Sequence, residues 1–163
     1  MIRHFMHCLA ITLLAATVFL PTHSAVRAQK PGALLVIVSA SIGLSDISSA
    51  SLRRAFQGYP TEYHPGKRLL PLNHATGSAE RTFFDQTVLG LSPGEVGRFW
   101  IDQKVRGASQ PPRSLPSASL AVRVVASFPG AITYTYPNLV RPGLTVLSID
   151  GKRPTDSDYF LAR

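Results

Sequence analysis

Cysteine is almost absent from this sequence, and its absence excludes several kinds of site. The one cysteine is Cys8, which lies in an apolar N-terminal run. A chain with no second cysteine can form no internal disulfide and no cysteine-rich zinc or iron–sulfur centre. Cys8 also lacks the small apolar residues that precede a lipidated cysteine, so we do not expect a lipoprotein anchor.

The N-terminus has the order of a secretory signal peptide. A short basic start at residues 1–4 precedes an apolar run at residues 8–20, and residues 26–28 suit a cleavage site. As a helix, the apolar run would reach about 20 Å, short of the roughly 30 Å hydrocarbon core. We therefore expect cleavage after Ala28 and a periplasmic or secreted mature chain, residues 29–163, that does not span the membrane.

Acidic residues are also scarce. The sequence has 17 lysines and arginines against 9 aspartates and glutamates, a formal net charge of +8. This balance favours an anionic partner, but export makes nucleic acid a poor candidate. The mature length suits one domain with a core of its own.

The pattern along residues 29–163 predicts one sheet covered by helices. Short apolar runs typical of buried strands occur at residues 34–38, 68–72, 131–136 and 144–149. Helical spacing behind a serine cap predicts helices that begin near Ser48, Ser78, Ser92 and Ser117. We expect loops or extended chain at residues 59–67 and 107–116. The order β-α-β-α-α-α-β-β indicates an α/β layer architecture.

Trp100 lies on a helical stripe with Val96 and Phe99. Such a stripe favours a place in the core over a role in stacking against a ligand. We therefore predict that Trp100 is a core residue.

Enzyme motifs are missing. The sequence has no Gly-x-Ser-x-Gly, Gly-x-Gly-x-x-Gly or His-Glu-x-x-His. Gly66-Lys67 lacks the earlier glycine of a phosphate-binding P-loop, and His64 and His74 have no nearby carboxylate pair to complete a metal site. We therefore predict a protein that is not an enzyme, with no catalytic residue, metal or cofactor.

The segment from Leu72 to Arg81 is the best candidate for a binding site. It runs from a strand end, through a glycine turn, into a helix, and such a junction directs free backbone N–H groups at one point, which suits an anion. An arginine in the first turn could add a charge-assisted contact. The candidate ligand-binding residues are Asn73, Thr76, Gly77, Ser78 and Arg81. The alternative is that Thr76 or Ser78 only caps the helix and Arg81 is solvated.

Four segments, in order, carry a resemblance to a known family. They are Leu-Arg-Arg-Ala-Phe-Gln-Gly at 52–58, the strand and helix at 70–84, Pro-Gly-Ala-Ile-Thr-Tyr at 129–134, and the tail at 150–163. Together they resemble the second lobe of phosphate-type substrate-binding proteins of ABC transporters, in the type 2 periplasmic binding protein superfamily. The resemblance implies a single periplasmic-binding-protein-like lobe, with one central mixed sheet flanked by helices, and a small phosphate-like anion as ligand.

Two departures from the family limit what the resemblance implies. Two-lobed members close on the ligand from both sides, whereas residues 29–163 have the length of one lobe. The family loop carries an arginine and an aspartate before its Gly-Ser, where this sequence has His74 or Ala75 and Thr76. The expectation is therefore weak oxyanion binding, or binding with a partner such as a second copy of the chain.

The other role that the resemblance leaves open is a lobe that has lost its ligand. Such a lobe would dock on a membrane receptor or transporter subunit through its cleft face, with Arg81, Lys104, Arg106 and the loop at residues 110–112.

Overall fold

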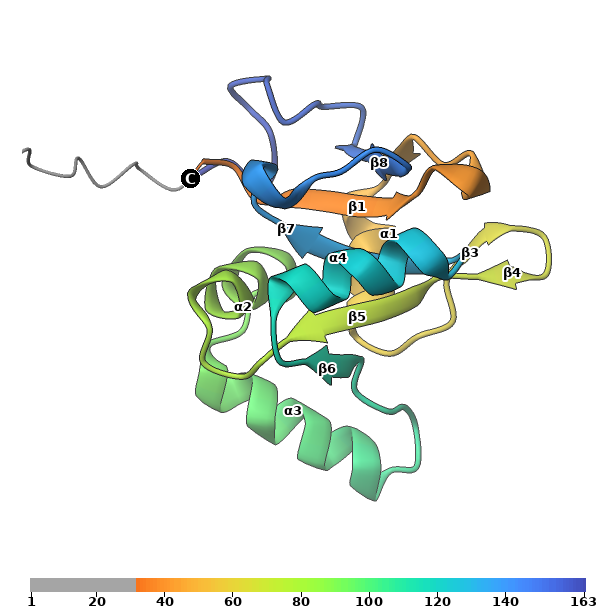
Figure 1. Cartoon of the computed structure of the whole chain (residues 1–163). Coiled ribbons are helices and arrows are strands. Elements are labelled where there is room, and N and C mark those ends of the chain that lie inside the picture. Colours follow the sequence, from red (N-terminus) through yellow and green to blue (C-terminus); the bar gives the residue numbers. More distant parts are fainter. Residues whose placement is uncertain (1–31) are drawn as a thin grey trace, which may run out of the picture.

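A five-stranded mixed sheet lies at the centre of the computed structural model, which describes residues 32–163 (Figure 1). The predicted signal peptide and its cleavage site lie outside the described residues. In spatial order the strands are β6 (Arg113–Leu115), β5 (Leu70–His74), β7 (Ala131–Thr135), β1 (Leu35–Ser39) and β8 (Leu144–Val146). β5 runs parallel to β6 and β7, whereas β1 is antiparallel to both β7 and β8. The predicted mixed sheet is confirmed.

Four α-helices accompany the sheet in the described part of the chain, and their ends follow from local sequence. They are α1 (Ser49–Phe56), α2 (Ala79–Phe84), α3 (Pro93–Val105) and α4 (Ala118–Ser127). α2 continues without a break into a π-helical turn, Asp85–Leu89, and short 3-10 turns occupy Ala40–Ile42 and Pro137–Leu139. The hydroxyls of Ser48, Ser78 and Ser117 cap three of the helices, and the backbone N–H of Ser92 donates to the Glu95 carboxylate at 2.8 Å. The predicted helix starts are confirmed, because these caps are interactions within four residues.

The helices form layers on both faces of the sheet. α4 covers one face, and α1 and α2 cover the other (Figure 1). Alternate residues of β1 therefore enter different clusters: Val36 and Val38 pack towards α1 and α2, while Leu35 and Ile37 pack towards α4. This two-sided burial is the reason that β1 is a continuous apolar run.

The prediction of a loop at residues 59–67 is wrong in part. A hairpin of β3 (Glu62–His64) and β4 (Lys67–Arg68) occupies most of this segment. Its turn is formed by Pro65 and Gly66, and Gly66 has φ +72°. The proline and glycine that indicated a loop thus sit at the turn and leave the strand residues free to pair. A second small sheet pairs β2 (Asp46–Ile47) with β9 (Ser148–Ile149).

Prolines also decide where β6 begins. β6 pairs with β5 from Leu72 opposite Arg113 to His74 opposite Leu115. Continued towards the N-terminus, this register would set Pro111 and Pro112 opposite the first two residues of β5. A proline has no N–H to donate, so the ladder stops and residues 111–112 only extend past the strand.

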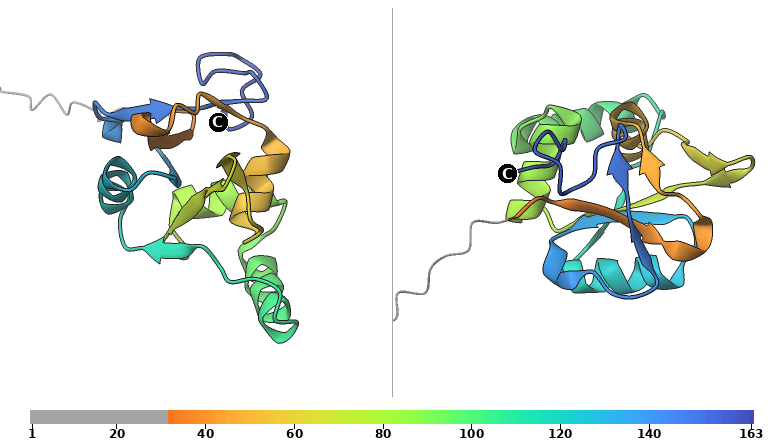
Figure 2. Two further views of the ribbon diagram at one scale, coloured as in Figure 1. Left: turned by 90° about the vertical axis from the view of Figure 1, so that its right-hand side faces the viewer. Right: turned by 90° about the horizontal axis from the view of Figure 1, so that it is seen from above.

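α3 lies beyond the β6 edge of the sheet and covers neither face (Figures 1 and 2). Within it only Val96 and Gln103 are buried, while Ile101 and Val105 are 67% and 81% exposed. Trp100 is half-buried, so its predicted place in the core is wrong. A helix that packs against an edge buries a narrower stripe than one that packs on a face. Among residues 32–163, no helix has the length and apolar character that a membrane crossing requires.

Candidate functional site

The turn at Thr76-Gly77-Ser78 joins the carboxyl end of β5 to the start of α2. Gly77 has φ +85°, a left-handed conformation that glycine adopts at little cost. The Ser78 hydroxyl accepts a hydrogen bond from the backbone N–H of Arg81 at 3.3 Å. Ser78 is thus the helix cap, in agreement with the capping alternative for this residue.

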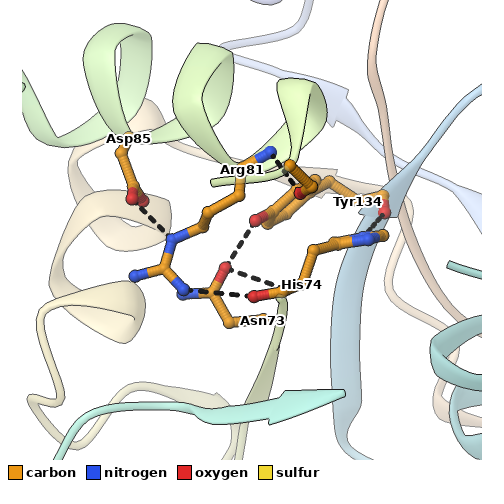
Figure 3. A network of polar contacts seen from close by, with 6 residues as sticks. Asn73, His74, Arg81, Asp85 and Tyr134 are labelled. Atoms are coloured by element: carbon orange, nitrogen blue, oxygen red, sulfur yellow. Dashed lines mark hydrogen bonds and ion pairs between the residues drawn. The ribbon is translucent and has the colours of Figure 1, made fainter. Parts of the chain in front are cut away.

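Arg81 is neither solvated nor free. Its side chain lies in the interior, where Nε donates to Asp85 Oδ2 at 2.5 Å and Nη1 donates to the His74 carbonyl at 3.3 Å (Figure 3). The expectation of a solvated Arg81 is wrong, because the ion pair and the carbonyl at the end of β5 draw the guanidinium inward. Within the described part of the chain, Nη2 makes no hydrogen bond to protein.

Asp85 is a functional candidate that the sequence reasoning missed. It lies four residues after Arg81, a spacing that puts the two side chains on one helix face, and this spacing could have revealed it. Burial raises the pKa of the Asp85 carboxyl, although attraction to the Arg81 guanidinium opposes that shift. Its second oxygen, Oδ1, is buried and has no partner among the described residues.

Asn73 and His74 belong to a polar network in the core. The Asn73 side-chain oxygen accepts hydrogen bonds from the Tyr134 hydroxyl and, at 3.2 Å, from the His74 N–H (Figure 3). The His74 ring donates through Nε2 to the Tyr134 carbonyl at 2.7 Å, and burial lowers the pKa of this imidazole. Burial also raises the pKa of Tyr134. The network holds β5 against β7 and uses the side-chain oxygen of Asn73 within the fold.

A cavity of about 440 Å³ opens beside the turn. One wall comes from the turn and the helix after it: Thr76, Gly77, Arg81, Thr82 and Asp85. α3 supplies a second wall, with Pro93, Val96, Gly97 and Trp100. The third wall is the approach to β6 and its first residues: Pro111, Pro112, Arg113 and Ser114. Of the five predicted ligand-binding residues, the structure thus brings Thr76, Gly77 and Arg81 to the cavity, whereas Asn73 and Ser78 are not part of its lining.

The charge of the cavity wall is nearly balanced. Asp85 neutralises Arg81, which leaves Arg113, an exposed cation with no ion pair within residues 32–163. The hydroxyls of Thr76, Thr82 and Ser114 add hydrogen-bonding groups. Besides Asp85 Oδ1, the Nε1 of Trp100 is buried without a partner, and a buried polar atom in that state is costly. These lining groups can hold a polar ligand. Among the described residues, no cluster of three histidine, cysteine or acidic side chains could hold a metal ion.

Comparison with solved structures shows that substrate-binding proteins of phosphate transporters share this mixed sheet with helices on both faces. An ABC-type phosphate transport receptor from Vibrio cholerae superposes with a TM-score of 0.60 at 13% identity. PstS from Borrelia burgdorferi gives 0.61 at 18% identity, and a phosphate-bound structure from Clostridium perfringens, described as a phosphate ABC transporter substrate-binding protein, gives 0.59 at 17%. The predicted fold class is confirmed.

These matches cover most of this chain but only part of the other proteins. They include 76%, 81% and 76% of this chain, and 48%, 55% and 47% of the Vibrio, Borrelia and Clostridium chains respectively. The chain thus spans about half the length of the structures that it matches. The sequence matches no protein-family model and no curated protein.

Proposed function

We propose that this protein is an exported binding lobe for a small phosphate-like oxyanion, which it holds weakly or together with a partner. The observation that carries the proposal is the cavity beside the Thr76-Gly77 turn, at the carboxyl end of β5. Ligands of open α/β sheets bind beyond the carboxyl ends of parallel strands. The fold is shared with proteins described as phosphate receptors, which are binding proteins and not enzymes. The exported location rests on the predicted signal peptide.

The balance of charge argues for weak binding. Hydrogen bonds that involve a charged group contribute about 1.5–3 kcal/mol each, and association costs at least about 4 kcal/mol. Because Asp85 already neutralises Arg81, Arg113 is the main uncompensated charge for the anion. A few such contacts support a dissociation constant near the millimolar range, about −4 kcal/mol. A second lobe, from another copy of the chain or from a membrane transporter subunit, would supply further contacts.

Calorimetric titration of the purified protein with phosphate at low salt tests the proposal, with sulfate as the comparison anion. We expect saturable heat, and a thermal stabilisation of about 1.4 kcal/mol when phosphate is ten times the dissociation constant. Absence of both heat and stabilisation at about 10 mM phosphate would contradict the capture of free anion.

Docking on a membrane receptor or transporter subunit is the second candidate role, and one observation favours it. The outer side of α3 presents Ile101 and Val105, both well exposed, next to the basic residues Lys104 and Arg106. Contiguous exposed apolar side chains rimmed by polar residues mark interaction surfaces, and Ile101 and Val105 are neighbours at four-residue spacing on the helix. If this face docks, the pair of changes Ile101→Ser and Val105→Ser should release the protein from the membrane fraction of its native cells without lowering its melting temperature. Retention of the variant in that fraction would contradict the docking role.

A further inference from the structure

The cavity at the Thr76-Gly77 turn is large and mostly apolar for a bare phosphate ion. We infer that its ligand is an organic oxyanion, in which the anionic group is joined to a flat apolar body that lies against Trp100. This inference rests on the proposed function, since it assumes that the turn receives an oxyanion, and it specifies the class of ligand.

The first argument is size. The cavity holds about 440 Å³, which lies in the range of roughly 300–1,000 Å³ typical of sites for drug-sized organic ligands. Inorganic phosphate has only five heavy atoms and would touch one wall of such a cavity at a time. A bare anion at the turn would leave the space in front of Trp100 and Pro112 unfilled.

The second argument is the chemistry of the walls. The walls from α3 and from the approach to β6 include Val96, Trp100, Pro111 and Pro112, which offer apolar rings and branched carbons. Aromatic rings favour flat apolar partners at stacking distance. Trp100 is half-buried at the cavity wall, so one part of its ring packs on protein and another part is available to a ligand.

The third argument is the charge at the polar end. Arg81 is held by Asp85, so this end lacks the surplus of positive charge that a small dianion needs in water. Thr76 offers a hydroxyl to an anionic group at the turn, and the exposed Arg113 elsewhere in the lining adds a positive charge. The unpaired Oδ1 of Asp85 suits a hydrogen-bond donor of the ligand. Apolar contact with the opposite wall is then the remaining source of affinity.

A pair of ligands with the same anionic group separates this inference from the proposed function. Phenylphosphonate and methylphosphonate differ only in the apolar body, and benzyl alcohol supplies a body without the anion. Trp100 is the one tryptophan in the sequence, so its fluorescence reports occupation of the cavity directly. We expect phenylphosphonate to bind about tenfold more tightly than methylphosphonate and to shift the Trp100 emission.

The outcomes fall into distinct classes. Equal affinity for the two phosphonates would overturn the inference of an organic ligand and leave the proposed oxyanion binding intact. Benzyl alcohol binding as tightly as phenylphosphonate, or no binding of either phosphonate or of phosphate, would contradict the oxyanion site itself.

Two glycines of α3 offer a matched pair of variants. Gly97 lies on the cavity wall, Gly94 lies outside it, and a Cβ at either position would meet no atom within 4 Å. Gly97→Leu should place a side chain in the cavity and abolish the tenfold preference for phenylphosphonate over methylphosphonate. Gly94→Leu should preserve the preference. Both replacements favour the helix, so the fold is expected to persist. A preference that survives Gly97→Leu would place the apolar body elsewhere and overturn the inference.

Discussion

Arg81 of α2 and Asp85, the first residue of the π-helical turn, form an ion pair with 2.5 Å between Nε and Oδ2, and both residues also line the cavity. The same guanidinium bonds the carbonyl of His74 at the end of β5. The pair therefore joins strand and helix at the place where the candidate ligand would bind. Its role in stability and its role in binding have to be tested by different measurements.

The ion pair is expected to contribute strongly to stability. Arg81→Ala should lower the free energy of unfolding by about 3–5 kcal/mol, because it leaves the Asp85 carboxylate buried without a partner. Replacing both residues with apolar ones, Arg81→Met with Asp85→Leu, should cost less than the single change. The matched control is Arg106→Ala, which breaks the exposed pair with Asp102 at the same four-residue spacing and should cost less than about 1 kcal/mol. Urea unfolding measures the free energy of unfolding of all three variants. Equal decreases for Arg81→Ala and Arg106→Ala would contradict the prediction.

Two glycines with left-handed backbones should differ in their tolerance of a side chain. A Cβ at Gly77 would meet no atom within 4 Å, so Gly77→Ala should cost only the conformational penalty of about 1–2 kcal/mol. A Cβ at Gly130 would lie 2.8 Å from the backbone oxygen of Arg68, so Gly130→Ala adds a clash to the same penalty. We expect a larger fall in melting temperature for Gly130→Ala. A larger fall in melting temperature for Gly77→Ala than for Gly130→Ala would contradict the expected clash at Gly130.

Stability should fall on acidification because of His74. Burial lowers the pKa of this imidazole below its ordinary value of 6.5, so between the two pKa values the unfolded chain binds more protons than the folded one. The free energy of unfolding should therefore decrease as the pH drops through about 6.5, until the folded-state pKa is reached. Unfolding measured from pH 7.5 to pH 5 checks this.

A pair of variants assigns the acid sensitivity to its residue. His74→Gln keeps a donor for the Tyr134 carbonyl but has no proton to gain, so its stability should depend less on pH than that of the wild type. His64→Gln changes the other histidine of the described residues, which lies at the surface of the hairpin, and should retain the wild-type dependence. If the free energy of unfolding changes with pH equally in wild type and in His74→Gln, His74 is not the source of the acid sensitivity.

Arg113 should contribute to anion affinity but not to the fold. It is exposed at the cavity wall, so Arg113→Gln should weaken phosphate binding about threefold to tenfold, an effect of about 1 kcal/mol, with little change in melting temperature. Arg123→Gln, which removes an exposed arginine of α4 that does not line this cavity, is the control for loss of net charge. Calorimetry should find the binding of the Arg123 variant close to that of the wild type. An equal loss in both variants would indicate attraction by overall charge alone.

Much of the fold was accessible from the sequence because its signals are local. The serine caps at Ser48, Ser78 and Ser117 act within one helical turn, and the continuous apolar run of β1 reflects burial on both sides. The hairpin of β3 and β4 escaped prediction because Pro65 and Gly66 gave the same signal for a tight turn as for a loop.

The candidate site was accessible only in part. The sequence pointed to the Thr76-Gly77 turn, and that turn does border the cavity. Asp85 was missed although its spacing from Arg81 was visible, since spacing alone does not tell whether a pair is buried. Trp100 was assigned to the core because its stripe on the helix is apolar, and the stripe contains no information on what the helix packs against.

The sequence by itself determined the local elements of this protein: the capped helices, the apolar strand β1 and the glycine turn ahead of Arg81. Each of these depends on residues that are close in the chain, so their interactions form wherever the segment lies. Only the tertiary structure decided that Arg81 is buried and paired, that Trp100 is half-exposed, and that residues 111–114 line the same cavity as the turn. Those features depend on segments brought together by the sheet order, with β6 paired beside β5 and α3 set at the open edge.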